Sequence, residues 1–261
     1  RDGNTNGNGN GNVNDGERRA RKATELMERM ELLAERRTRS ATSAAAASAT
    51  GGTRGGDRFR GAEAAADVRP NAHTYAACIA AWARSRAVGR AEMALSLLNE
   101  MKGRSSDEPS LRPGTYHRNW VIKACAGPTY GIDPLSAEED NRRSFEIALE
   151  MYEEILNLKD DGDGDLDLDL DLDLDLRPDS RTYAFFLGAC RNPTLGIQER
   201  EKRASGAFQR CRTDGMVTGE AIHHLMRAVR PMEYMELVGA FGQYEVDVED
   251  LPEEWSRNAR R

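Results

Sequence analysis

The sequence predicts an all-α fold: an α-solenoid of helix-turn-helix repeats with disordered low-complexity insertions and a disordered N-terminal tail. The first observation behind this prediction is a pattern of apolar side chains at positions i, i+3, i+4 and i+7, which line one face of a helix. The pattern occurs four times, in segments that we name second helices: Ala23, Leu26, Met27, Met30; Ala94, Leu97, Leu98, Met101; Ala148, Met151, Tyr152, Ile155; Ala204, Ala207, Phe208, Cys211.

The second observation is that another helix with the same spacing precedes each of the last three stretches. These first helices carry Tyr75, Cys78, Ile79, Trp82; Arg118, Val121, Ile122, Cys125; and Tyr183, Phe186, Leu187, Cys190. Helix pairs that recur along a chain bury their stripes against one another, which is the arrangement of a solenoid.

Prolines mark where the first helices begin. A proline precedes the last stripe residue of each first helix by 12 positions, at Pro70, Pro113 and Pro178. Proline is favoured at the entry to a helix and cannot continue one backwards. Ser136 and Glu139 have capping-box spacing before a second helix. We expect antiparallel pairs at residues 72–85 with 90–102, 116–126 with 136–158, and 180–191 with 198–214, followed by a divergent pair within 222–241.

Low-complexity segments divide the chain. Residues 37–68 are rich in Ala, Ser, Thr, Gly and Arg, and residues 160–176 contain six Asp-Leu pairs. Each follows a second helix, where an insertion leaves the stacking of repeats intact. We expect residues 3–12, 37–60 and 160–175 to lack fixed structure. The predicted organisation is a disordered tail at 1–16, a partial repeat helix at 17–36, an insertion at 37–68, the repeat region at 69–241 with its acidic insertion at 160–176, and an acidic C-terminal tail at 242–261.

The charge of the chain is unevenly distributed. The formal net charge is −7, but nine aspartates lie within residues 160–175, and removing them leaves +2. Six more acidic residues lie within 245–254. The helical body is therefore mildly basic, which permits binding to nucleic acid without being diagnostic of it.

Cysteines and one arginine stand out on the apolar stripes. Cys78, Cys125, Cys190 and Cys211 have no Cys-x-x-Cys spacing. We interpret them as buried, reduced thiols rather than metal ligands or disulfides, which fits a reducing compartment. Arg118 lies where an aromatic residue is expected, so either its helix is shifted or the side chain extends outward to solvent.

The sequence contains no convincing motif for metal binding, catalysis or membrane insertion. His223 and His224 are adjacent and point to different sides of a helix, so we expect solvated or partly buried histidines. The acidic tract has EF-hand-like Asp spacing, but position 12 of such a loop would be Leu172 rather than Glu. There is no phosphate loop, catalytic carboxylate pair or nucleophile elbow. We predict no enzyme, no cofactor, no metal site and, without a run of about 18 apolar residues, no membrane span.

These residues resemble the pentatricopeptide repeat family, whose units are helix-turn-helix pairs of about 35 residues. Residues 69–75, Arg-Pro-Asn-Ala-His-Thr-Tyr, are similar to the family's entry into a first helix. Ala94, with Leu97, Leu98 and Met101, is similar to its second helix. Residues 111–114 and 176–179 resemble the turn that closes one unit. The resemblance covers roughly residues 17–241 without the insertions.

The resemblance implies binding of single-stranded RNA, in organellar RNA processing, stability or translation in a mitochondrion or plastid. The chain begins with Arg1, so we expect the natural N-terminus and any targeting segment to lie upstream. In the family, the residue after the first-helix Tyr and the last residue of the unit read one base. The implied pairs are Ala76 with Gly114, Asn119 with Asp179, and Ala184 with a partner near Met216 that is not clear from the sequence.

The resemblance also implies which pair discriminates between bases. The pair Asn119 and Asp179 favours uracil, whereas Ala and Gly side chains cannot discriminate by hydrogen bonding. His73, Tyr116 and Arg181 lie where the family sandwiches bases, and each can stack on a base plane. The alternative interpretation is that these are exposed polar residues at helix starts.

A second class of function stays open, which is a helical-repeat scaffold that binds protein partners through the same surface. The electrostatics of the first helices discriminate between the two. A basic surface with exposed stacking groups favours RNA, whereas a neutral surface with an exposed apolar patch favours protein.

Overall fold

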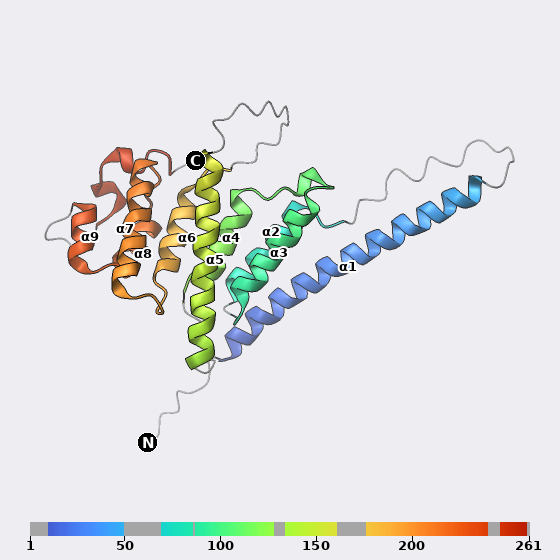
Figure 1. Ribbon diagram of the computed structural model, residues 1–261, viewed down its shortest axis with the longest axis horizontal. Helices are drawn as coiled ribbons and strands as arrows, with labels where there is room; N and C mark the ends of the chain where they lie inside the picture. Colours follow the sequence, from blue (N-terminus) through green and yellow to red (C-terminus); the bar gives the residue numbers. More distant parts are fainter. Residues whose placement is uncertain are drawn as a thin grey trace, which may run out of the picture.

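The structure is a computed structural model, and it describes residues 10–49, 69–85, 87–127, 134–160, 176–239 and 246–259. Within these ranges the chain is helical, without strands. The α-helices are α1 Asn10–Ala49, α2 Ala72–Ser85, α3 Arg90–Arg104, α4 Thr115–Cys125, α5 Pro134–Asp160, α6 Ser180–Cys190, α7 Ile197–Thr213, α8 Gly219–Ala228 and α9 Pro231–Val238 (Figure 1). Short 3-10 turns occur at η1 Pro109–Leu111, η3 Val248–Asp250 and η4 Glu253–Trp255. The all-α prediction is confirmed for this part of the chain.

The three predicted helix pairs are present, and each pair is in contact. They are α2 with α3, α4 with α5, and α6 with α7. The predicted bounds are correct to within two residues at each end. The capping box was placed wrongly, because α5 begins at Pro134 and therefore includes both Ser136 and Glu139. Proline is favoured in the first turn of a helix, where its missing N–H costs nothing.

Each first helix packs against the next one: α2 against α4, α4 against α6, and α6 against α8. Each of α3, α5 and α7 packs against two first helices, its own and the following one. In Figure 1, α5 and α7 lie nearer the viewer than α4 and α6. The stripe residues of these helices are buried in one hydrophobic core. The four cysteines are buried and unpaired in disulfides, as predicted.

Within each helix pair, a polar side chain of the first helix bonds to an acidic side chain on or directly after the second helix. Tyr75, Arg118 and Tyr183 occupy the same position in α2, α4 and α6. The hydroxyl of Tyr75 donates to Glu100 on α3 at 2.6 Å, and the hydroxyl of Tyr183 donates to Asp214 just after α7. Arg118 makes the corresponding bonds to Glu154 on α5. The same position in α2, α4 and α6 therefore bonds to an acid that lies on the second helix of its pair or directly after it.

Arg118 corrects a prediction. Its side chain is only 7% exposed, so it does not extend outward to solvent. Its Nη2 lies 2.9 Å from Glu154 Oε1, and its Nη1 donates to the carbonyl of Pro113 at 2.6 Å. Lys102 donates to the other Glu154 oxygen at 2.8 Å. A buried guanidinium is tolerated on the stripe because these acceptors satisfy its charge and donors.

The titration of Glu154 predicts how this pair responds to acid. Burial opposes ionisation, but the bonds from Lys102 and Arg118 outweigh it and hold the pKa of Glu154 below its ordinary value of 4.5. A carboxylate with a lowered native pKa stabilises the fold above its unfolded pKa, and this contribution is lost as the pH falls through the native pKa.

We therefore expect the difference in unfolding free energy between the native chain and the Glu154→Gln variant to be constant above about pH 5.5 and to shrink at more acid pH. Urea unfolding at a series of pH values measures this difference. A difference that grows towards acid pH would contradict the assignment.

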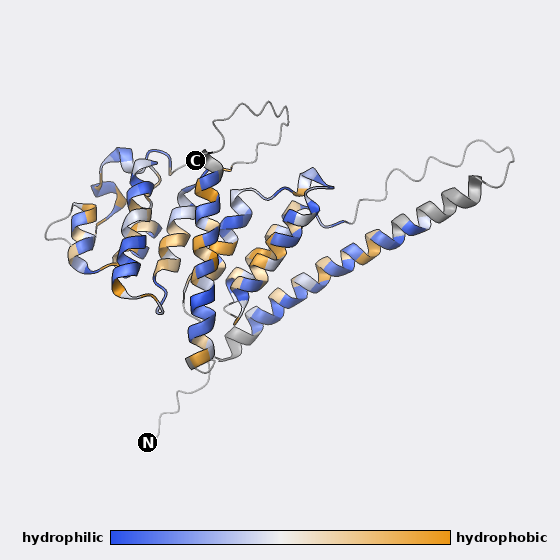
Figure 2. Ribbon diagram, in the orientation of Figure 1, coloured by the Kyte–Doolittle hydropathy of each residue, from blue (hydrophilic) through white to orange (hydrophobic). Residues whose placement is uncertain are grey.

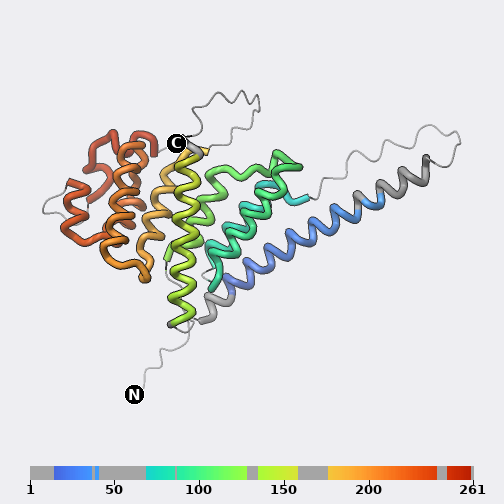
Figure 3. Tube along the Cα trace, in the orientation of Figure 1, coloured from blue at the N-terminus to red at the C-terminus, as the bar shows by residue number. Residues whose placement is uncertain are grey.

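Helix α1 is longer than predicted. It runs from Asn10 to Ala49, so the prediction of a disordered tail is wrong for residues 10–16 and the prediction of no fixed structure is wrong for residues 37–49. The alanines at 44–47 have high helix propensity, which the classification of this segment as low-complexity insertion overlooked. Asp160 is helical as the last residue of α5, and residues 161–175 lie outside the described ranges. Helix α1 extends beyond α2 and away from the other helices (Figure 3).

The C-terminal segment packs against the body and is more than an acidic tail. Leu251 is 8% exposed, and Trp255 packs edge-on against Phe208 of α7. The guanidinium of Arg212 lies 3.7 Å from the centre of the Trp255 ring. The backbone N–H of Val217 donates to the Trp255 carbonyl at 2.8 Å. The acidic composition of this segment concealed two apolar side chains, buried Leu251 and Trp255, of which Trp255 packs on α7.

Candidate nucleic-acid interface

Side chains on one side of the first helices form a shared surface, which we name the first-helix face. Its members recur at matching positions of α2, α4, α6 and α8, because residues spaced by three or four lie on the same side of a helix. The face consists of His73, Arg84, Tyr116, Trp120, Lys123, Arg181, Phe185, Arg191, Glu220 and His224. Four Lys and Arg side chains and one carboxylate give this set a net positive charge when its histidines are neutral.

Aromatic rings and cations alternate at the centre of this face. The Arg84 guanidinium lies 4.4 Å from the centre of the Trp120 ring, and Lys123 Nζ lies 4.1 Å from that of Phe185. Trp120 itself contacts Phe185, with 6.4 Å between ring centres, and Tyr116 edge-on at 6.2 Å. Tyr116 is 48% exposed. Trp120 is partly exposed, whereas Phe185 is only 6% exposed and supports the other rings from below. An exposed ring flanked by cations, such as Tyr116 here, is a group on which nucleic-acid bases stack.

The far end of the face contains its one acid. The His224 side chain is the main cause that lowers the pKa of Glu220, with further contributions from nearby Lys123 and Arg181. Gly188 of α6 allows the close approach of His224, because a Cβ there would lie 3.4 Å from its Nε2. His223 is exposed and His224 is partly buried, in agreement with the prediction for both. Arg191 also contacts the His224 ring at 3.4 Å.

The structure brings the predicted base-reading pair together. Asn119 Nδ2 donates to Asp179 Oδ1 at 2.9 Å, across 60 residues of sequence. Asn119 Oδ1 accepts the Thr182 hydroxyl at 2.8 Å, and the residue is only 2% exposed. Asp179 also caps α6 by accepting the Thr182 backbone N–H at 2.8 Å. Asn119 thus joins α4 to the start of α6, a role that sequence reasoning missed and that the Asp-x-x-Thr cap spacing could have indicated.

The other residues that the resemblance implied divide into two groups. Ala76, Ala184 and Gly114 are buried. Gly114 caps the start of α4, and its N–H donates to His117 Nδ1 at 3.3 Å. His73, Tyr116 and Arg181, the predicted stacking residues, are exposed on the first-helix face. The stacking positions are therefore exposed, whereas Asp179 is the one named base-reading residue that is even partly exposed.

The hydrogen bonds of Asn119 predict that its removal destabilises the fold. The Asn119→Ala substitution leaves the Thr182 hydroxyl and the Asp179 cap without this partner, so we expect a loss of about 1–3 kcal/mol in unfolding free energy. RNA affinity should change little, and any uracil preference should disappear. Urea unfolding and oligonucleotide titration of the same sample measure both effects. Unchanged stability would contradict the structural role of Asn119.

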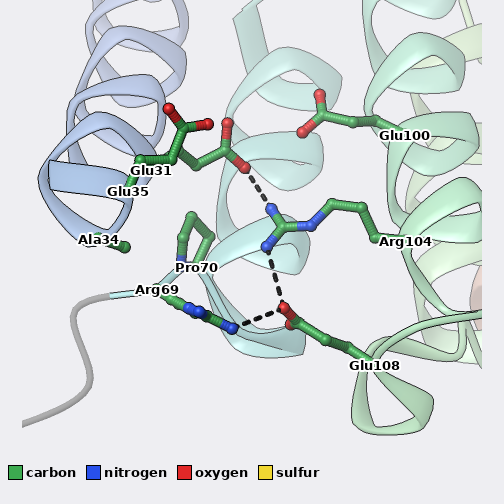
Figure 4. A pocket seen from close by; sticks show the side chains of 8 residues that line it. All are labelled: Glu31, Ala34, Glu35, Arg69, Pro70, Glu100, Arg104 and Glu108. Carbon is green, nitrogen blue, oxygen red and sulfur yellow. Dashed lines mark hydrogen bonds and ion pairs between the residues drawn. The ribbon is translucent and has the colours of Figure 1, made fainter. Parts of the chain in front are cut away.

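A separate pocket of about 380 Å³ lies between α1 and α3. Figure 4 shows Arg104 at its centre, between Glu31 of α1 and Glu108. Arg69 pairs with the same Glu108 at 3.2 Å. Burial, with the neighbouring Glu100, raises the pKa of Glu31. Because these acids and arginines bond to one another, the ion pairs that line the pocket connect α1 to α3.

Metal sites and membrane spans were also sought among the described residues. Among them, no group of three or more His, Cys, Asp and Glu side chains is arranged to hold a metal ion. None of the helices in the described ranges is both long and apolar enough to cross a membrane. Comparison of the chain with protein-family models, curated proteins and solved structures finds no match.

Proposed function

We propose that this chain is a helical-repeat protein of the pentatricopeptide type, a short α-solenoid whose first-helix face binds single-stranded RNA. The observation that carries the proposal is the alternation of cations and rings on that face, with Tyr116 48% exposed and Arg84 and Lys123 against neighbouring rings. Single-stranded RNA offers bases that stack on rings and phosphates that attract cations. By the criterion of a basic surface with stacking groups, RNA is favoured over protein as the ligand of this face.

The expected ligand is an organellar transcript, bound with little base specificity. The family resemblance supports an organellar transcript as the ligand, in a mitochondrion or plastid, with a role in processing, stability or translation. Base recognition should be weak, because Asn119 and Asp179 already bond to each other and to Thr182. A base would have to compete with these bonds. We therefore expect sequence-tolerant binding with at most a mild uracil preference.

The test is titration of fluorescent 12-nucleotide U and A strands and a double-stranded RNA with the full chain. We expect micromolar or weaker affinity for single strands, because three repeats contact about three bases. Affinity should fall as salt is raised, since cations contact phosphates. Equal binding of single- and double-stranded RNA, or binding that salt does not weaken, would refute the proposal.

The acidic tract is expected to lower the affinity of the chain for RNA. Residues 160–175 carry nine aspartates close in sequence to α6, and most of them lie outside the described residues. If the tract reaches the first-helix face, it repels phosphates by an interaction that salt screens. Deleting residues 161–175 should tighten RNA binding at low salt and have less effect at high salt. An equal effect at both salt concentrations would exclude this electrostatic explanation.

A further inference from the structure

One repeat position differs sharply between α1 and the other second helices. Leu26, Leu97, Met151 and Ala207 occupy the same position of the apolar stripe. Leu97, Met151 and Ala207 are 4%, 1% and 3% exposed, whereas Leu26 is 53% exposed. Leu33, two turns further along α1, is 52% exposed. Figure 2 shows that hydrophobic residues recur along α1 just as they do in the packed helices.

The packing explains the difference. Helices α3, α5 and α7 each lie against two first helices, whereas α2 is the only first helix in the described ranges that packs against α1. Met27 and Ala34 face α2 and are 1% and 8% exposed. The side of α1 that carries Leu26, Met30 and Leu33 is where the other second helices meet the first helix of their own pair. This side continues an interface that is filled three times elsewhere in the molecule.

The charges beside this line favour one kind of occupant. Lys22 and Arg29 are exposed and lie beside the line on the edge away from Met27, with Glu25 further round the helix, by the 100° rotation between successive helical residues. A helix that covers the leucines and neutralises this flank needs apolar side chains on one face and carboxylates beside them.

We propose that Leu26, Met30 and Leu33 form the docking site of an amphipathic helix from a partner protein, with acidic side chains along the edge of its apolar face. The partner helix takes the place on α1 that a first helix takes on α3, α5 and α7. This binding uses a surface distinct from the first-helix face, so it does not depend on RNA binding.

The probe is a fluorescent synthetic helix of 18 residues with leucines at i, i+3, i+7 and i+10 and glutamates on both flanks. Its controls have the same composition in scrambled order, or lysines in place of the glutamates. Fluorescence anisotropy with the full chain should give binding that is at least about tenfold tighter for the glutamate helix than for either control. Equal binding of the three peptides would overturn the proposal.

The chain offers a matched control of its own. Leu32 is 55% exposed on the same helix but points about 100–120° away from Leu26 and Leu33. Leu26→Asp and Leu33→Asp should each weaken binding of the glutamate helix at least about tenfold, whereas Leu32→Asp should leave it unchanged. Circular dichroism melting checks that the three variants fold alike. Equal losses in all three variants would overturn the proposal, as would a Leu26-dependent dimer of the chain in sedimentation, because a second copy would then occupy the site.

Discussion

Replacing Glu154 with methionine should lower the free energy of unfolding by about 3 kcal/mol, because it leaves the Arg118 guanidinium buried without its counter-charge. Arg118 is 7% exposed and Glu154 is 28% exposed. We place the expected loss at the lower end of the range for buried pairs because Glu154 retains contact with water. Urea unfolding of the native chain and the variant measures the loss.

The double variant Arg118→Met with Glu154→Met is the control for this prediction. Apolar replacement of a whole buried pair is often neutral or stabilising, because both desolvation costs disappear. We expect the double variant to be within about 1 kcal/mol of the native chain and clearly more stable than the Glu154→Met variant. If the two substitutions simply add, Arg118 and Glu154 are not coupled as their distances indicate.

Removing the exposed ring of the first-helix face should reduce RNA affinity strongly. Stacking on an aromatic side chain contributes about 1–3 kcal/mol per base, so Tyr116→Ala should weaken binding by roughly 5- to 150-fold. Tyr116→Phe keeps the ring and should bind almost as tightly as the native chain. Arg181→Glu should weaken binding uniformly across sequences and flatten its salt dependence. Fluorescence anisotropy over a range of salt concentrations measures all three.

Second helices provide the matched controls for these variants. Lys202 on α7 and Arg142 on α5 are exposed cations outside the first-helix face. Because Lys202→Glu and Arg142→Glu change the net charge by as much as Arg181→Glu, they report the effect of overall charge alone. Losses as large as that of Arg181→Glu would show that binding follows net charge rather than this surface.

Much of the fold could be predicted from the sequence because it depends on local periodicity. The stripes of α2 to α7 and the buried cysteines follow from spacings of three and four residues. The burial of Arg118 could not, since it requires Glu154 to be brought close to it from 36 residues away. The packing of Trp255 against Phe208 likewise depends on a contact between distant segments.

The candidate site was predictable only in part. The family spacing identified His73, Tyr116 and Arg181, which are exposed on one surface. It also paired Asn119 with Asp179, but it did not indicate that they bond to each other or that Asn119 is buried. Trp120 and Phe185 escaped notice because they lie between the positions that the family pattern emphasises. Their ring contacts with Arg84 and Lys123 emerge only from helix packing.

Photo-crosslinking tests RNA binding on the first-helix face most directly. A 12-nucleotide strand of 4-thiouridine is irradiated with the full chain, and the crosslinked residues are located by mass spectrometry. We predict crosslinks at Tyr116, Trp120 and His224, on α4 and α8. Crosslinks confined to the second helices α5 and α7, with none on α2, α4, α6 or α8, would contradict RNA binding on this face.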